Sequence, residues 1–89
     1  MTGARIQDME DQTAQTIKEF VYQRFPQARK RAIGEGDSLL ESGIVDSLGI
    51  LEIVGFLEKT YAITIADDDL VSENFETVTA LSAFVARKR

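Results

Sequence analysis

Cysteine and histidine are both absent from this 89-residue chain, and each absence removes a class of chemistry. Without cysteine, disulfide bonds and thiolate metal sites are excluded. Without histidine, the chain lacks the side chain that most often serves as a general base and as a metal ligand. We therefore expect no catalytic residue and no metal site, and we do not expect an enzyme.

Long apolar runs are absent too, because no segment approaches the roughly 20 apolar residues that cross a membrane. Residues 1–11 are polar and lack the apolar stretch of a signal peptide, so we expect a cytoplasmic protein with no membrane span. Apolar and polar residues do not alternate with a period of two, and no strand is predicted. Pro26 is the single proline, and no internal repeat is visible.

Basic residues are scarce in the middle of the chain. Residues 35–76 contain eleven Asp or Glu and one base, Lys59, whereas residues 1–34 contain six Lys or Arg and four Asp or Glu. The net charge of −5 argues against nucleic acid as a partner. An acidic stretch is either a solvated surface or a docking face for basic partners, and the uneven distribution favours docking.

Apolar residues at helical spacing predict three main helices, at about Thr13–Phe25, Ser47–Tyr61 and Thr77–Arg87. Pro26 should stop the first of them. A short helix is expected to open at Asp67–Asp69, where carboxylates meet the positive end of a helix dipole. A calcium loop is excluded there, because the required glycine and glutamate are missing.

The connection from Gln27 to Asp46 is too long to lack all structure, so part of it should pack against the helices. Its expected anchors are Leu39, Leu40 and Ile44. The predicted fold is all-α, a small bundle of three main helices plus one short helix with a long first loop. We expect one domain over residues 1–89, with residues 1–11 as a frayed extension of the first helix or a mobile arm.

The helix predicted at Ser47–Tyr61 has two apolar sides. The side expected to face the core contains Ile50, Ile53, Val54, Leu57 and Tyr61. The other side contains Leu48, Leu51 and Gly55 between Glu52 and Glu58. A second apolar stripe suggests an interaction face, unless a neighbouring loop covers it. Further core residues should be Ile17, Phe20 and Val21 early in the chain, and Phe75, Val78, Leu81 and Val85 near its end, with Phe84 at the margin.

Ser47 stands where the long loop meets this helix, directly after Asp46. Both residues are good N-caps, and a serine at a helix start is most often a cap. A nucleophilic serine is disfavoured, because no histidine exists and the Gly-x-Ser-x-Gly motif is absent. A phosphorylated or phosphopantetheinylated serine has a physical rationale, because a phosphodiester in the first turn would meet free N–H groups and the positive dipole end.

The run Leu-Leu-Glu-Ser-Gly-Ile-Val-Asp-Ser-Leu at residues 39–48 resembles the end of the first loop in acyl carrier proteins, with their Asp-Ser-Leu signature at residues 46–48. Residues 51–61 resemble the recognition helix of that family, and residues 73–78 resemble the segment before its last helix, so the resemblance spans roughly residues 13–86. It implies covalent 4′-phosphopantetheine on Ser47 and a role for Asp46 in transferase docking. It also implies partner contacts by Leu48, Leu51, Glu52 and Glu58, and we include Gly55 in that face.

Two glycines depart from the fatty-acid type of carrier, which usually has a polar residue at the position of Gly49 and a larger apolar one at Gly55. A glycine inside a helix costs about 1 kcal/mol relative to alanine. Either glycine is therefore interpreted as a point of close approach for a partner or for the arm. The run Gly43–Ser47 is more similar to stand-alone carriers of amino acids, such as the D-alanine carrier, so the cargo is left open.

We thus predict a monomeric stand-alone carrier that holds acyl or aminoacyl groups as thioesters. Its expected partners are a phosphopantetheinyl transferase, an acyl or aminoacyl ligase and downstream enzymes that use the acyl group. The alternative is an unmodified acidic helical adaptor that binds partners through the Leu48/Leu51 face.

Overall fold

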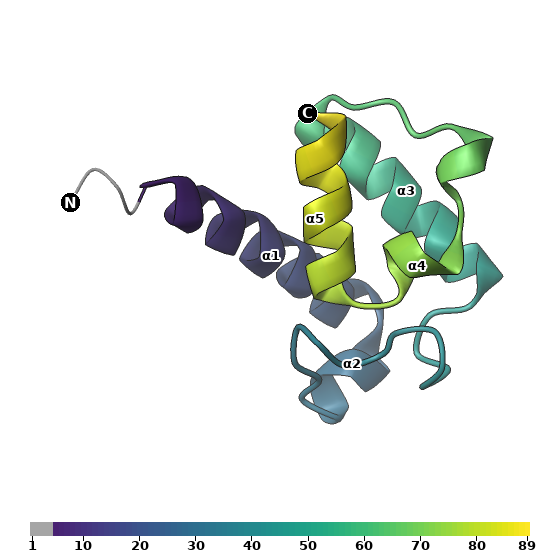
Figure 1. Ribbon diagram of the computed structural model, residues 1–89. Coiled ribbons are helices and arrows are strands. Elements are labelled where there is room, and N and C mark those ends of the chain that lie inside the picture. Colours follow the sequence, from purple (N-terminus) through teal and green to yellow (C-terminus); the bar gives the residue numbers. More distant parts are fainter. Residues whose placement is uncertain (1–4) are drawn as a thin grey trace.

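The computed structural model describes residues 5–89, with side chains from Gln12 onward. Within that part the chain is helical and contains no strand, so the prediction of an all-α bundle is confirmed (Figure 1). The long helices are α1 (Arg5–Arg24), α3 (Ser47–Tyr61) and α5 (Val78–Lys88). Two short helices, α2 (Pro26–Lys30) and α4 (Ser72–Phe75), and the 3₁₀ turn η2 (Asp67–Asp69) complete the set.

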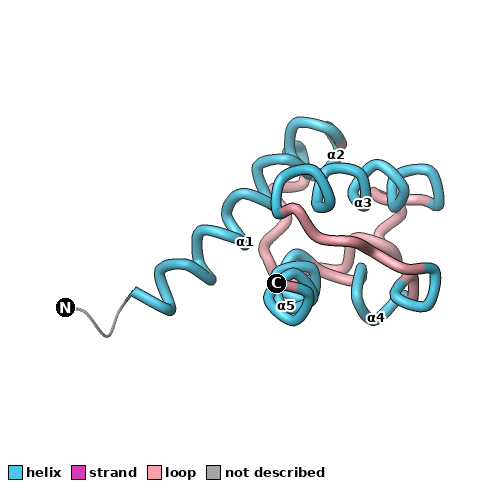
Figure 2. Tube along the Cα trace, turned by 90° about the horizontal axis from the view of Figure 1, so that it is seen from above, coloured by secondary structure: helices cyan, strands magenta, loops and turns pink. Residues whose placement is uncertain are grey.

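The helices surround a single core from different sides. Figure 2 shows α2 and α3 on one side of the bundle and α4 and α5 on the other. Helix α1 packs against α2 and α5, and α4 also packs against α5. The N-terminal part of α1 extends beyond the rest of the bundle. No helix in the described residues is long and apolar enough to cross a membrane.

Helix α1 ends at Arg24, within one residue of the end predicted at Phe25, before Pro26. Helix α2 was missed by the sequence prediction, because Pro26 also occupies the first turn of a new helix, after Phe25 in an extended conformation. Proline suits that position, because its missing N–H would have no helical partner there. Buried Ala28 fixes α2 to the core. The first loop is therefore shorter than predicted.

The other helix boundaries differ less. Helix α3 has the predicted boundaries, and it ends where Ala62 adopts a left-handed conformation with φ of 55°. Helix α1 begins at Arg5 rather than Thr13, so residues 5–11 extend the first helix, whereas residues 1–4 lie outside the described part. Helix α5 begins at Val78, because the Thr77 hydroxyl caps it by accepting from the Ala80 N–H at 2.9 Å.

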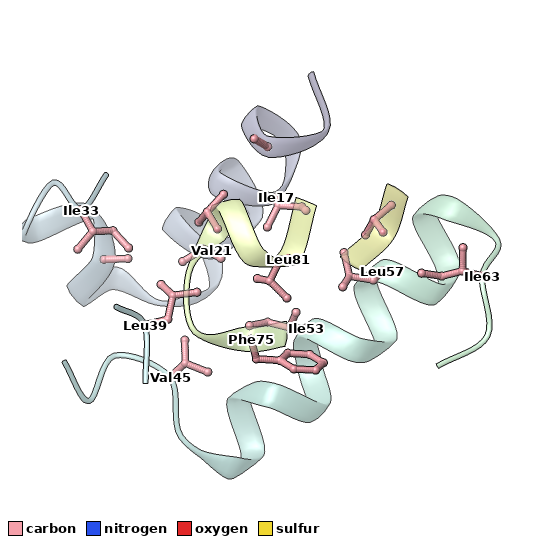
Figure 3. Close-up of a cluster of buried hydrophobic side chains, with 14 residues drawn as sticks. Ile17, Val21, Ile33, Leu39, Val45, Ile53, Leu57, Ile63, Phe75 and Leu81 are labelled. Atoms are coloured by element: carbon pink, nitrogen blue, oxygen red, sulfur yellow. The ribbon is translucent and has the colours of Figure 1, made fainter. Parts of the chain in front are cut away.

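The core is wholly apolar among the residues whose side chains are described (Figure 3). Ile53 and Leu57 of α3 are buried as predicted, whereas Ile50, Val54 and Tyr61 are only half-buried. Phe84 is fully buried and not marginal, because α5 is covered by both α1 and α4. The largest fully buried side chains are Ile17, Val21, Leu39, Ile53, Leu57, Phe75, Val78, Leu81, Phe84 and Val85.

Candidate functional site

The segment before Ser47 is held by contacts from both ends of the chain. The Leu39 N–H donates to the Glu76 carbonyl at 2.7 Å, and the Tyr22 hydroxyl donates to the Ile33 carbonyl at 2.6 Å. Of the expected anchors, Leu39 is buried and Leu40 and Ile44 are half-buried. Val45, which the sequence prediction missed, is also buried, two residues before Ser47. The loop therefore delivers the start of α3 to a defined position.

The end of this loop needs an unusual backbone conformation at one residue. Gly43 has φ of 79°, which glycine adopts without the steric cost that other residues meet. The Gly43 N–H donates to the Leu40 carbonyl at 3.1 Å, and the Val45 N–H donates to the Leu39 carbonyl at 3.0 Å. This turn places Val45 inward and leaves the following residue, Asp46, exposed.

Asp46, and not Ser47, caps α3. The Asp46 Oδ1 accepts from the Gly49 N–H at 2.9 Å, and the Asp46 carbonyl accepts from the Ile50 N–H. Ser47 is the first helical residue, its side chain is exposed, and within the described residues its hydroxyl has no hydrogen-bond partner. The cap interpretation of the sequence thus applies to Asp46 and leaves the Ser47 Oγ available for chemistry.

The predicted second apolar stripe of α3 lies on the surface. Leu48 is 70% exposed and Leu51 is 59% exposed, so no loop in the described chain covers them. Gly55 is also exposed, and no heavy atom would lie within 4 Å of a Cβ placed on it. We call Leu48, Leu51 and Gly55 the α3 stripe. Exposed Lys59, which the sequence prediction did not assign to it, continues the stripe by one turn.

The two glutamates beside the α3 stripe are half-buried and engaged within the chain. Glu52 forms an ion pair with Arg24 of α1, next to a stack of Phe20 on Phe56 with ring centroids 4.1 Å apart. Glu58 Oε2 accepts from the Ile65 N–H at 2.9 Å. Both carboxylates therefore help hold the fold around the stripe, a role that the helix pattern alone did not reveal.

Gly49 is buried and does not face a partner. A Cβ on it would lie 2.9 Å from the Phe25 Cε1 and 3.0 Å from the Val45 Cγ1. The close approach predicted for this glycine is real, but the group that approaches is the chain's own Phe25. Gly49 thus allows the end of α1 to pack against the start of α3.

A second exposed apolar pair was missed by the sequence prediction. Leu70 is 39% exposed and Val71 is 43% exposed, between η2 and α4. The only available signal was an apolar pair isolated between the aspartates of η2 and Ser72.

Asp69, in the acidic segment, has a lowered pKa. The Lys88 ammonium, 2.9 Å from the Asp69 Oδ2, and then the Ala66 N–H hold the pKa of Asp69 below its usual range. This pair ties η2 to the end of α5. Within the described residues, no three Asp or Glu side chains come together as metal ligands.

The site around Ser47 thus has three features: an exposed hydroxyl, a helix N-terminus and an exposed apolar stripe.

Residues 23–85 match the model of a protein family described as a phosphopantetheine attachment site. The fold is similar to the solution NMR structure of a holo acyl carrier protein from Nitrosomonas europaea, with a TM-score of 0.71. That likeness has 23% sequence identity and covers 86% of this chain and 95% of the other, so it shows the fold. No curated protein matches the sequence.

Proposed function

This chain belongs to the phosphopantetheine attachment-site family, and from that membership we propose that it is a stand-alone carrier protein with its arm on Ser47. Its cofactor is covalent 4′-phosphopantetheine. When attached, this arm supplies the thiol that the cysteine-free chain lacks, and it holds acyl or aminoacyl groups as thioesters.

The exposed hydroxyl of Ser47 is the observation that carries this proposal. Asp46 already caps α3, so the Ser47 Oγ has no role in the fold that an ester bond would disturb. The first backbone hydrogen bond of α3 is donated by the Ile50 N–H to the Asp46 carbonyl. The N–H groups of Ser47 and Leu48 come before it in the chain and have no helical carbonyl to donate to. These free donors and the positive end of the helix dipole favour a phosphate in the first turn.

The chain itself is proposed to catalyse nothing. It acts as a tether that raises the effective concentration of its cargo at each partner enzyme. The α3 stripe, with Asp46, Glu52 and Glu58 around it, is the proposed docking face for a phosphopantetheinyl transferase, an acyl or aminoacyl ligase and downstream enzymes. We propose a monomer in the cytoplasm, because a chain without cysteine needs no oxidising compartment to fold.

Intact mass spectrometry after incubation with a broad-specificity phosphopantetheinyl transferase and coenzyme A tests the attachment. The wild-type chain should gain one arm, and Ser47→Ala should gain none. Ser47→Ala should fold normally, since no cap is lost. Ser72→Ala is the matched control, because Ser72 is also exposed at the first position of a helix, and it should be loaded like the wild type.

An unmodified wild-type mass would favour the alternative of an adaptor that binds through the Leu48/Leu51 face. A modified Ser47→Ala variant would place the arm on another residue. Either result would overturn the proposal as stated.

A further inference from the structure

The two glycines inside α3 have different surroundings, and only one of them is explained by the fold. Gly49 is buried against Phe25 and Val45, so a side chain there would clash. Gly55 is exposed, and a Cβ on it would meet no atom within 4 Å. Glycine in a helix interior lowers stability relative to alanine. Gly55 therefore lowers the stability of the bundle, and none of the described contacts requires a glycine at this position.

The position of Gly55 on the helix suggests what this glycine is for. At about 100° per residue, Gly55 lies one turn beyond Leu51 and two turns beyond Leu48 on the same face. The stripe thus passes from two projecting leucines to bare helix backbone. The backbone N–H and C=O groups of Gly55 lie in the helix interior, between Leu51 and Lys59, and are used in helical hydrogen bonds. What faces outward is Cα–H, flanked by Leu51.

We propose that Gly55 is the close-approach point of the docking face, and that it selects partner enzymes which place a bulky apolar side chain directly over the α3 backbone beside Leu51. This inference rests on the proposed function and specifies the kind of partner. A polar group seated there would find no free backbone donor or acceptor, so an apolar side chain fits better.

Charge restricts the partner further. The carboxylates beside the stripe, exposed Asp46 and half-buried Glu52 and Glu58, favour a basic rim on the partner. Lys59, one turn beyond Gly55, repels such a rim at the far end of α3. The basic groups should therefore lie toward the Ser47 end of the stripe. A second copy of this chain fits poorly as the occupant, because two acidic faces would repel each other.

The test measures how fast a broad-specificity phosphopantetheinyl transferase loads each variant from coenzyme A, as a function of carrier concentration. The variants are Gly55→Ala and Gly55→Leu. The matched control is Thr60→Leu, which adds the same side chain at an exposed α3 position about 140° around the helix from Gly55. Melting temperature, final mass and oligomeric state are recorded for every form.

We expect Gly55→Ala to melt at a higher temperature than the wild type and yet to load with a higher KM. For Gly55→Leu the KM should rise about tenfold, since an overfilled contact weakens packing by an amount of that order. Thr60→Leu should keep the wild-type KM. All forms should still end with one arm per chain at long incubation times.

A wild-type or lower KM for Gly55→Leu would overturn the inference, and so would an equal rise for Thr60→Leu. A change in oligomeric state with an unchanged KM would identify a second copy as the occupant and would also overturn it. Failure of the wild-type chain to load is a different result, which would overturn the proposed function itself.

Discussion

At the scale of single residues, Gly49 shows how closely α1 and α3 are fitted together. The Phe25 ring, just after α1, occupies the space where any other residue would put its Cβ. Phe25 is only half-buried, so its ring has some room to move. The cost of filling position 49 therefore depends on how far this one ring can retreat.

We predict that Gly49→Ala lowers the free energy of unfolding by about 1–3 kcal/mol, as overpacking does. Helix propensity alone would predict the opposite, a gain of up to about 1 kcal/mol. Urea denaturation measures the difference. The double variant Gly49→Ala with Phe25→Leu should lose less than the sum of the two single changes, because the clash is removed. A more stable Gly49→Ala chain would show that Phe25 does not hold this position.

At the scale of the helix, the N-cap of α3 is Asp46. The resemblance to acyl carrier proteins implies a second role for this residue, in transferase docking. Asp46 can serve both roles, since its Oδ1 accepts from the Gly49 N–H while its side chain remains exposed. The two roles depend on different properties. Capping needs an acceptor oxygen, whereas attraction to a basic partner needs the negative charge.

Asp46→Ala should lower the free energy of unfolding by about 0.5–2 kcal/mol, the usual cost of a lost N-cap. Asp46→Asn keeps an acceptor and should be close to the wild type in stability. Both changes should slow loading by the transferase if the charge assists docking. Thermal denaturation and loading rates, measured on the same samples, separate the effects. Normal loading of Asp46→Asn would leave Asp46 with capping alone.

The same helix shows what local pattern can predict. The boundaries of α3 and the place of Leu48 and Leu51 on a second side of it were predictable, because spacing along one helix determines them, whereas only the structure shows that no described loop covers these leucines. Helix α2 was not predictable in this way, because a proline can either end a helix or begin one. In the folded chain a helix begins at Pro26 and buries Ala28 against the core.

Contacts between different helices could not be predicted from the spacing of residues along each helix. The Arg24–Glu52 pair and the Phe20–Phe56 stack depend on how α1 lies along α3. Phe84 was misjudged for a similar reason, since α5 is covered on two sides.

At the scale of the whole molecule, most charges are acidic and repel one another, but α5 ends in bases that face acidic elements. Lys88 pairs with Asp69, and the Arg87 guanidinium donates to the Asn74 Oδ1 at 2.9 Å. These contacts tie the end of the chain to η2 and α4. Asp69 is the carboxyl group whose pKa reports this tie.

A folded-state pKa below the unfolded value stabilises the fold when the group is ionised. The contribution of Asp69 should therefore be present at pH 7 and lost as the pH falls below about 4 and through the lowered pKa. We expect Asp69→Asn to be less stable than the wild type at pH 7, with the difference vanishing once the pH lies below the lowered pKa of Asp69. Added salt should reduce this stability difference at pH 7, because the Asp69–Lys88 ion pair is partly exposed.

Asp68→Asn is the control for this experiment, because Asp68 has no ion-pair partner in the described part of the chain. It removes the same charge from the neighbouring position and should not reduce stability at pH 7. Urea titrations of the three proteins across the pH range provide the comparison. Parallel curves for Asp69→Asn and the wild type would show that the Lys88 pair contributes nothing.

The order in which a ribosome makes this chain gives the first loop a further consequence. The loop is held by the Glu76 carbonyl, which accepts from Leu39, and by the Thr79 N–H, which donates to the Glu35 carbonyl at 3.0 Å. Both partners are synthesised more than thirty residues after the loop residues that they bind. Ser47 therefore emerges early, but the segment that presents it can take this conformation only once residues 76–79 have also emerged and folded. An enzyme that reads the folded surface around Ser47 would then act only after residues 76–79 have been made and folded, although Ser47 itself is made earlier.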